Sequence, residues 1–89
     1  MSDYKKLFVV RVSGITVGVK KTLNGAVDSF PELFKKRFPK MSGEFKMDTS
    51  KPSIFRNVRM SGIFYFKVIN QENEMFFTAS IEKLNNVNL

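Results

Sequence analysis

The sequence predicts an α+β domain, in which an antiparallel β-sheet of five or six strands carries one kinked helical region on one face. Three observations support this fold class. A hexapeptide occurs twice, as VRVSGI at residues 10–15 and as VRMSGI at residues 58–63, and each copy places Ser-Gly inside an alternating apolar segment, as in a tight hairpin. Between the copies, apolar residues recur at helical spacing. The chain has 89 residues, 43% of them hydrophobic, which is enough for one modest core.

The first hairpin follows from the alternation on both sides of Ser13-Gly14. Gly14 supplies the positive φ that a two-residue loop requires. The predicted cross-strand pairs, with all side chains on one face, are Val12 with Ile15, Val10 with Val17, and Phe8 with Val19. The same register places Lys6 opposite Lys21 at the open end of the hairpin.

The helical region lies between the two hexapeptides. Its apolar positions are Leu23, Ala26, Val27, Phe30, Leu33, Phe34 and Phe38. Pro31 removes a helical hydrogen bond and disfavours helical dihedrals at Phe30, so we expect a kink or two short helices. Ser29 and Glu32 could form a capping box for the second piece, at about residues 30–38, which ends before Pro39.

The second half of the chain reads mainly as strands. We expect a short strand at 44–48, a turn at 49–53, and a second hairpin whose strands, 54–60 and 63–69, are joined by Ser61-Gly62. The polar residues 70–73 lead into a last strand at 74–82. The single domain then covers residues 1–84, and residues 85–89 form a flexible tail.

Two alternatives to this architecture stay open. A small β-barrel of the OB or SH3 kind is the main rival, because the second half is nearly all strand. A duplicated half-domain would also explain the repeated hexapeptide, but the segments that follow the two copies share no clear pattern. Two independent hairpin turns are therefore the favoured interpretation.

The residue inventory argues against an enzyme. The chain has no His and no Cys, so His general bases, Cys nucleophiles and the usual zinc sites are excluded. No phosphate-binding loop is present, and the close acidic pair Glu72 and Glu74 flanks a polar turn, where solvated charge is the ordinary explanation. We expect no catalytic activity, no cofactor and no metal.

The net charge of +7 is concentrated in the first half of the chain. Residues 1–40 contain nine basic and three acidic residues, whereas residues 41–89 contain six basic and five acidic residues. A concentrated positive field favours association with polyanions. The competing explanation is a biased composition that reflects no selection for binding.

Three groups of residues are candidate nucleic-acid contacts. Lys5, Lys6, Lys20 and Lys21 gather at the open end of the first hairpin, where a phosphate backbone would relieve their repulsion. The segment FKKRFPK adds Lys35, Lys36, Arg37 and Lys40. The third group comes from one face of the predicted second hairpin, which mixes aromatic and basic side chains, and consists of Arg59, Phe64 and Phe66.

Each group has a purely structural alternative. The lysines could fan into solvent, since exposed charges contribute little on their own. Arg37 could snorkel from the last turn of a helix. Phe55, Phe64 and Phe66 could be core, which the usual burial of large apolar side chains favours.

Two function classes remain. The leading one is a small, basic, non-catalytic protein that binds nucleic acid, with RNA or single strands preferred because no DNA-reading helix is evident. The alternative is an inhibitor or modulator of an acidic host protein, of the kind found among viral accessory proteins. A weaker option is an anionic membrane surface, contacted through residues 30–40. We expect a cytoplasmic protein without a signal peptide or transmembrane segment, and a homodimer stays open.

Overall fold

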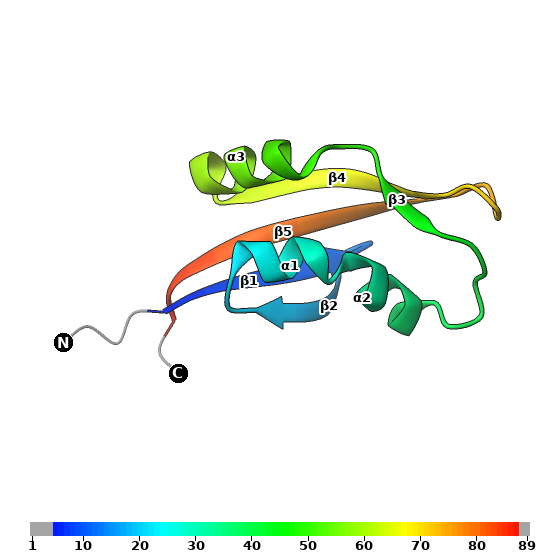
Figure 1. Cartoon of the computed structure of the whole chain (residues 1–89). Helices are drawn as coiled ribbons and strands as arrows, with labels where there is room; N and C mark the ends of the chain where they lie inside the picture. Colours follow the sequence, from blue (N-terminus) through cyan, green and yellow to red (C-terminus); the bar gives the residue numbers. More distant parts are fainter. Residues whose placement is uncertain (1–4, 88–89) are drawn as a thin grey trace.

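The computed structural model describes residues 5–87. The elements follow one another as β1 (Lys5–Val12), β2 (Ile15–Lys20), α1 (Leu23–Asp28), α2 (Phe30–Arg37), β3 (Phe45–Met47), α3 (Lys51–Ser61), β4 (Ile63–Asn70) and β5 (Met75–Val87) (Figure 1). The strands form one antiparallel sheet in the order β2-β1-β5-β4-β3. The predicted α+β class with an antiparallel sheet is confirmed. The alternative of a closed barrel is wrong, because β2 and β3 are the free edges of an open sheet.

The first hairpin forms at the predicted loop but keeps only part of the predicted register. Ser13 and Gly14 both have positive φ, 52° and 82°, and Val12 pairs with Ile15 as expected. A bulge then follows, because Arg11 pairs with Thr16 while Val10 pairs with Gly18. The predicted pairs Val10 with Val17 and Phe8 with Val19 are therefore wrong.

Gly18 lies next to the bulge and contacts helix α2. A Cβ atom on Gly18 would lie 3.0 Å from a methyl group of Leu33, so α2 packs directly on the backbone of β2. The extra residue also moves Val19 to the opposite face of the sheet, where it pairs with Val9 and is 51% exposed. Alternation alone does not predict this shift, because one extra residue moves every later side chain of the strand to the other face.

The kinked helical region is confirmed as two helices that meet at Ser29. α1 ends at Asp28 and α2 begins at Phe30, with Pro31 in its first turn, where a missing N–H is tolerated. The predicted capping box is wrong. The Ser29 hydroxyl instead donates a hydrogen bond of 2.9 Å to the Ala26 carbonyl, and it makes no cap contact with α2.

The largest correction is α3 (Lys51–Ser61), which begins within the predicted turn at 49–53 and replaces the predicted strand at 54–60. Ser50 caps its N-terminus by accepting a hydrogen bond of 3.3 Å from the Ser53 N–H, and Pro52 lies in its first turn. Gly62 ends it with φ of 81°. The Ser61-Gly62 hairpin is therefore wrong, and Gly62 connects a helix to β4.

The long hairpin of β4 and β5 is the remaining part of the sheet. β4 and β5 pair from Ile63 with Glu82 to Asn70 with Met75, so the predicted polar turn after residue 70 is confirmed. β5 continues to Val87 and pairs with β1 beyond the predicted end at 82. Residues 85–87 thus belong to a strand although they were assigned to the tail, and residues 88–89 lie outside the described part.

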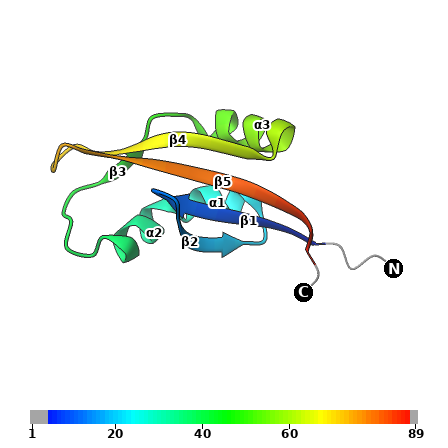
Figure 2. The same ribbon diagram turned by 180° about the vertical axis from the view of Figure 1, so that it is seen from behind.

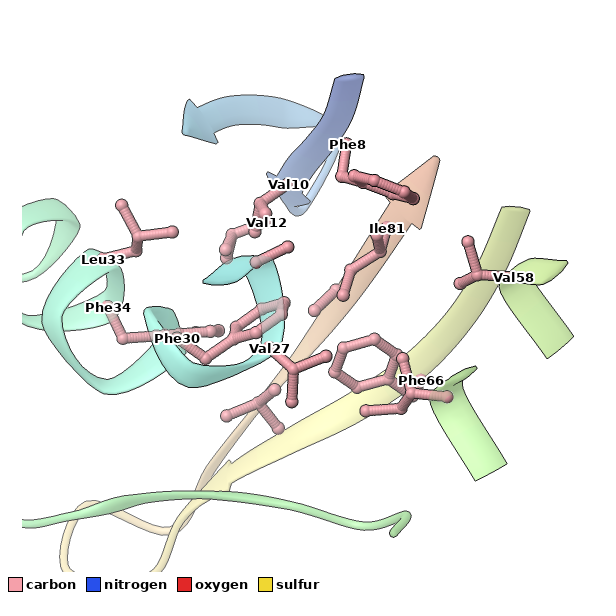
Figure 3. Packing of buried hydrophobic residues seen from close by; sticks show 14 of the residues in the cluster. Phe8, Val10, Val12, Val27, Phe30, Leu33, Phe34, Val58, Phe66 and Ile81 are labelled. Carbon is pink, nitrogen blue, oxygen red and sulfur yellow. The ribbon is translucent and has the colours of Figure 1, made fainter. Parts of the chain in front are cut away.

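The core lies between the sheet and the three helices (Figure 3). Phe8, Val10 and Val12 of β1 face it, as the alternation predicts. The largest buried ring is Phe34 of α2, whose ring centroid lies 5.8 Å from that of Phe77 on β5. The helix positions that close the core are Leu23, Ala26, Val27, Phe30, Leu33, Ile54 and Val58.

Candidate nucleic-acid interface

The two faces of the sheet have different surroundings. α1, α2 and α3 cover one face, and Figure 2 shows the other face, which no helix covers within residues 5–87. Because side chains alternate along a strand, the residues next to the core positions belong to this second side, here called the open face. Cross-strand pairing groups Val9 with Glu82, Tyr65 with Ser80, and Lys67 with Thr78 on the open face.

Two exposed aromatic rings lie on the open face, Tyr65 of β4 and Phe76 of β5. They are 64% and 67% exposed, and neither ring contacts another ring or a cation in the described part of the chain. Tyr65 pairs with Ser80, four residues from Phe76 along β5, so the residues that carry the two rings are offset by about 13 Å along the strand direction. Large aromatic side chains are normally buried, which makes two bare rings on one face a candidate binding surface.

Basic side chains accompany these rings. The pair of Lys67 and Thr78 lies between the positions of the two rings, and Lys67 is exposed. Lys46 of β3 pairs with Ile69 on the same face and is also exposed. Arg11 is committed elsewhere, since its guanidinium donates to the Glu82 carboxylate at 2.7 Å. Within residues 5–87 neither lysine has an acidic partner, so the open face offers the ammonium groups of Lys46 and Lys67 beside the two rings.

The lysines predicted at the hairpin end remain near one another, but their cross-strand pairing differs. Lys20 pairs with Phe8, and β2 ends there, so Lys21 does not pair with Lys6. Lys6 and Lys21 are exposed, Lys20 is partly exposed, and only the backbone of Lys5 is described. The predicted repulsion of Lys6 against Lys21 across a ladder is thus absent from the strand pairing.

The predicted basic segment of residues 34–40 forms the end of α2 and the loop after it. Lys35, Lys36, Arg37 and Lys40 are all exposed. The Arg37 guanidinium lies 4.9 Å from the centroid of the Phe38 ring, so it covers that ring from the solvent side. These four cations lie on a helix and loop on the helix-covered side, apart from the open face.

The third predicted group does not form a stacking platform. Phe66 is only 6% exposed and packs edge-on against Phe30 at 5.2 Å, so it belongs to the core. Phe64 faces the same side, is partly buried and stacks against Phe66 at 5.8 Å. Arg59 belongs to α3, where its guanidinium lies 5.4 Å from the Phe55 ring centroid. The structural alternative, in which these phenylalanines are core, holds for Phe66.

Sequence reasoning missed Tyr65 and Phe76 because it followed the face with more phenylalanines. The alternation in IFYFKVIN already places Tyr65 and Lys67 on one side and Phe64 and Phe66 on the other. The signal that could have located the open face is the composition of those two sides. The side with Phe64 and Phe66 is typical of a buried core face, whereas the side with Tyr65 and Lys67 is typical of a solvent-exposed face.

Other kinds of site find no support among residues 5–87. That part of the chain contains no group of three or more acidic, His or Cys side chains able to hold a metal ion. Its helices are all too short and too polar to cross a membrane. Comparison of the chain with protein-family models, curated proteins and solved structures gives no significant match.

Proposed function

We propose that this protein binds single-stranded nucleic acid, RNA or DNA, on the open face of its sheet and does so without catalysis. The observation that carries the proposal is the pair of exposed rings, Tyr65 and Phe76, with Lys67 between their positions. Bases stack on aromatic rings, and cations between the rings meet the phosphates that join the bases. A net charge of +7 supplies the attraction at long range.

A single strand fits this surface better than a duplex. In a double helix the flat faces of the bases are stacked on one another, so rings on a sheet cannot reach them. The residues that carry the rings are offset by about 13 Å along the strand direction, which leaves room for an unstacked nucleotide between two that are stacked on the rings. No side chain in this arrangement selects among bases, so we expect little sequence preference.

The lysines outside the open face have a secondary role in this proposal. Lys6, Lys20, Lys21, Lys35 and Lys36 add to the positive potential that attracts a polyanion, but they belong to β1, to β2 and its end, and to α2, whereas the rings belong to β4 and β5. Their loss should lower the association rate and the salt dependence together. The contribution of the rings is different, because stacking depends little on salt.

The test is a fluorescence anisotropy titration of oligouridylate and oligothymidylate with the wild-type protein and with Tyr65→Ala and Phe76→Ala. Each substitution should weaken binding by about 1 to 3 kcal/mol. Thermal unfolding should change little, because both rings are exposed. Met60→Ala is the control, since Met60 is 80% exposed but lies on α3.

Salt dependence completes the test. Replacing Lys67 with Gln should lower the slope of log affinity against log salt by about 0.7, the value for one phosphate contact of a single strand. The proposal fails if the wild-type protein shows no salt-dependent binding near physiological ionic strength. It also fails if Tyr65→Ala and Phe76→Ala bind as tightly as Met60→Ala, since the rings would then have no part in recognition.

A further inference from the structure

The outer side of α3 is a second exposed surface with its own composition. Ile54 and Val58 of this helix are fully buried, so the opposite side of the helix faces solvent. That side borders an open hollow of about 630 Å³, lined by Lys51, Pro52, Phe55, Arg56, Arg59 and Met60. This set, here called the α3 face, lies on the helix-covered side of the sheet, away from Tyr65 and Phe76.

The charge of the α3 face is largely uncompensated. Lys51 is paired with Asp28 of α1, with 2.9 Å between the Nζ and Oδ1 atoms. Arg56 and Arg59 are exposed, and within residues 5–87 neither has an acidic partner. Two free guanidinium groups one helical turn apart are arranged to meet two acidic groups at the same spacing.

Apolar surface lies between these cations. Met60 is 80% exposed, Pro52 is exposed, and Phe55 is partly buried. The Phe55 ring has Lys51 Nζ at 5.6 Å and the Arg59 guanidinium at 5.4 Å from its centroid, so cations already lie against it. A base would have to displace them in order to stack, which distinguishes this ring from Tyr65 and Phe76.

We infer that the α3 face binds an acidic amphipathic helix of a protein partner. The positions 52, 55, 56, 59 and 60 follow the i, i+3, i+4, i+7, i+8 pattern of one side of a helix, the pattern by which two helices pack. Leucine-like side chains of the partner would cover Met60, Pro52 and Phe55. Its carboxylates would meet Arg56 and Arg59, and this charge complementarity favours an acidic partner over a second copy of this basic chain.

The test uses three labelled probes and the intact protein. The first is a synthetic peptide with Leu and Glu at helical spacing, the second is a peptide of the same composition in scrambled order, and the third is oligothymidylate. We expect the amphipathic peptide to bind at least about tenfold more tightly than the scrambled one and to gain helical circular dichroism when bound. Met60→Ala should weaken only the amphipathic peptide.

Two double variants separate the α3 face from general charge. Arg56→Gln with Arg59→Gln should weaken the amphipathic peptide about tenfold, the order expected for two exposed ion pairs. Lys35→Gln with Lys36→Gln removes the same charge from α2 and should change that affinity less than about threefold. Each double variant keeps the open face and loses two positive charges, so both should lower the affinity for oligothymidylate by the same small factor, through the weaker long-range attraction.

Three results would overturn the inference. Equal affinity for the amphipathic and scrambled peptides would mean that the face recognises charge alone. A loss of oligothymidylate binding confined to the Arg56 and Arg59 variant would make α3 a nucleic-acid surface. If the amphipathic peptide did not bind even at low salt, the α3 face would not be a binding site for an acidic helix. The two peptide outcomes do not involve Tyr65 or Phe76, so the inference and the proposed function can fail separately.

Discussion

The two copies of the hexapeptide differ at one residue and adopt different structures. In VRVSGI, residues 10–15, the chain runs as a strand, turns through Ser13 and Gly14, and returns as a strand. In VRMSGI, residues 58–63, the first four residues end helix α3, and Gly62 leads into β4. Both glycines have nearly the same φ, 82° and 81°. The shared glycine therefore provides the left-handed residue at the end of an element, but it does not determine whether that element is a strand or a helix.

What differs between the copies lies in the residues that precede them. The segment KKLFV before the first copy continues into it as a single strand, β1, which pairs with β2 on one side and with β5 on the other. The second copy is preceded by Ser50 and Pro52, which start a helix, and by Ile54, which lies one turn from Val58. A helix start signal eight residues upstream thus decides how the hexapeptide folds.

Substitutions at the third position of the two copies, Val12 and Met60, should show the largest difference in the free energy of unfolding. Val12 is 1% exposed in the core, whereas Met60 is bare on α3. Val12→Lys places an unpaired charge among apolar side chains and should destabilise the protein by more than about 4 kcal/mol. Met60→Lys should stay within about 0.5 kcal/mol, because the side chain remains in water. Urea unfolding of both variants measures the difference, and comparable losses would contradict a helix at the second copy.

The glycines test what the copies share. A Cβ atom on Gly14 or Gly62 would meet nothing within 4 Å, so the cost of alanine comes only from the positive φ. Gly14→Ala and Gly62→Ala should each destabilise by about 1 kcal/mol, measured by thermal unfolding. Gly43→Ala is the comparison, because Gly43 also has positive φ, 91°, but its Cβ atom would lie 2.8 Å from the Glu72 Cβ atom, so it should cost more than either. If Gly62→Ala alone left the unfolding temperature unchanged, the positive φ of Gly62 at the end of α3 would be contradicted.

Much of the fold could be predicted from local patterns, and α3 shows where they fail. Ile54, Arg56, Val58 and Met60 read as alternation, but Ile54 and Val58 are also four residues apart, so two periods fit the same short segment. Ser50 and Pro52 resolve the ambiguity in favour of a helix. The same residues also fit the predicted turn at 49–53, because Ser and Pro are common in turns as well.

The candidate interface was less predictable than the fold. The alternation separated Tyr65 from Phe64 and Phe66 correctly, but which side faces the helices depends on how the sheet is assembled. Phe76 went unnoticed because its strand neighbours Met75 and Phe77 are apolar as well. Gly18 is a local signal of the bulge, because an isolated glycine in a strand is typical of a bulge or of a close approach to the backbone, here by Leu33.

The fourth position of the hexapeptide gives the smallest and most selective prediction. Ser13 has φ of 52°, a left-handed conformation that serine tolerates poorly, and it precedes a glycine that also has positive φ. This is the type I′ pattern, in which Asn-Gly is the favoured pair. Ser61 is the last residue of α3 and has no positive φ. Asparagine should therefore relieve backbone strain at position 13, whereas position 61 has no such strain to relieve.

We expect Ser13→Asn to stabilise the protein by about 0.5 kcal/mol, since asparagine recovers part of the penalty for a left-handed residue. Ser61→Asn should leave the free energy of unfolding unchanged, because serine and asparagine have similar helix propensities. The Ser13 N–H donates to the Thr78 carbonyl at 2.7 Å, a backbone contact that both side chains leave intact. Equal stabilisation at both positions would mean that residue 61 also takes up a left-handed conformation. The two copies would then share a turn after all, and the assignment of residues 51–61 to a helix would not stand.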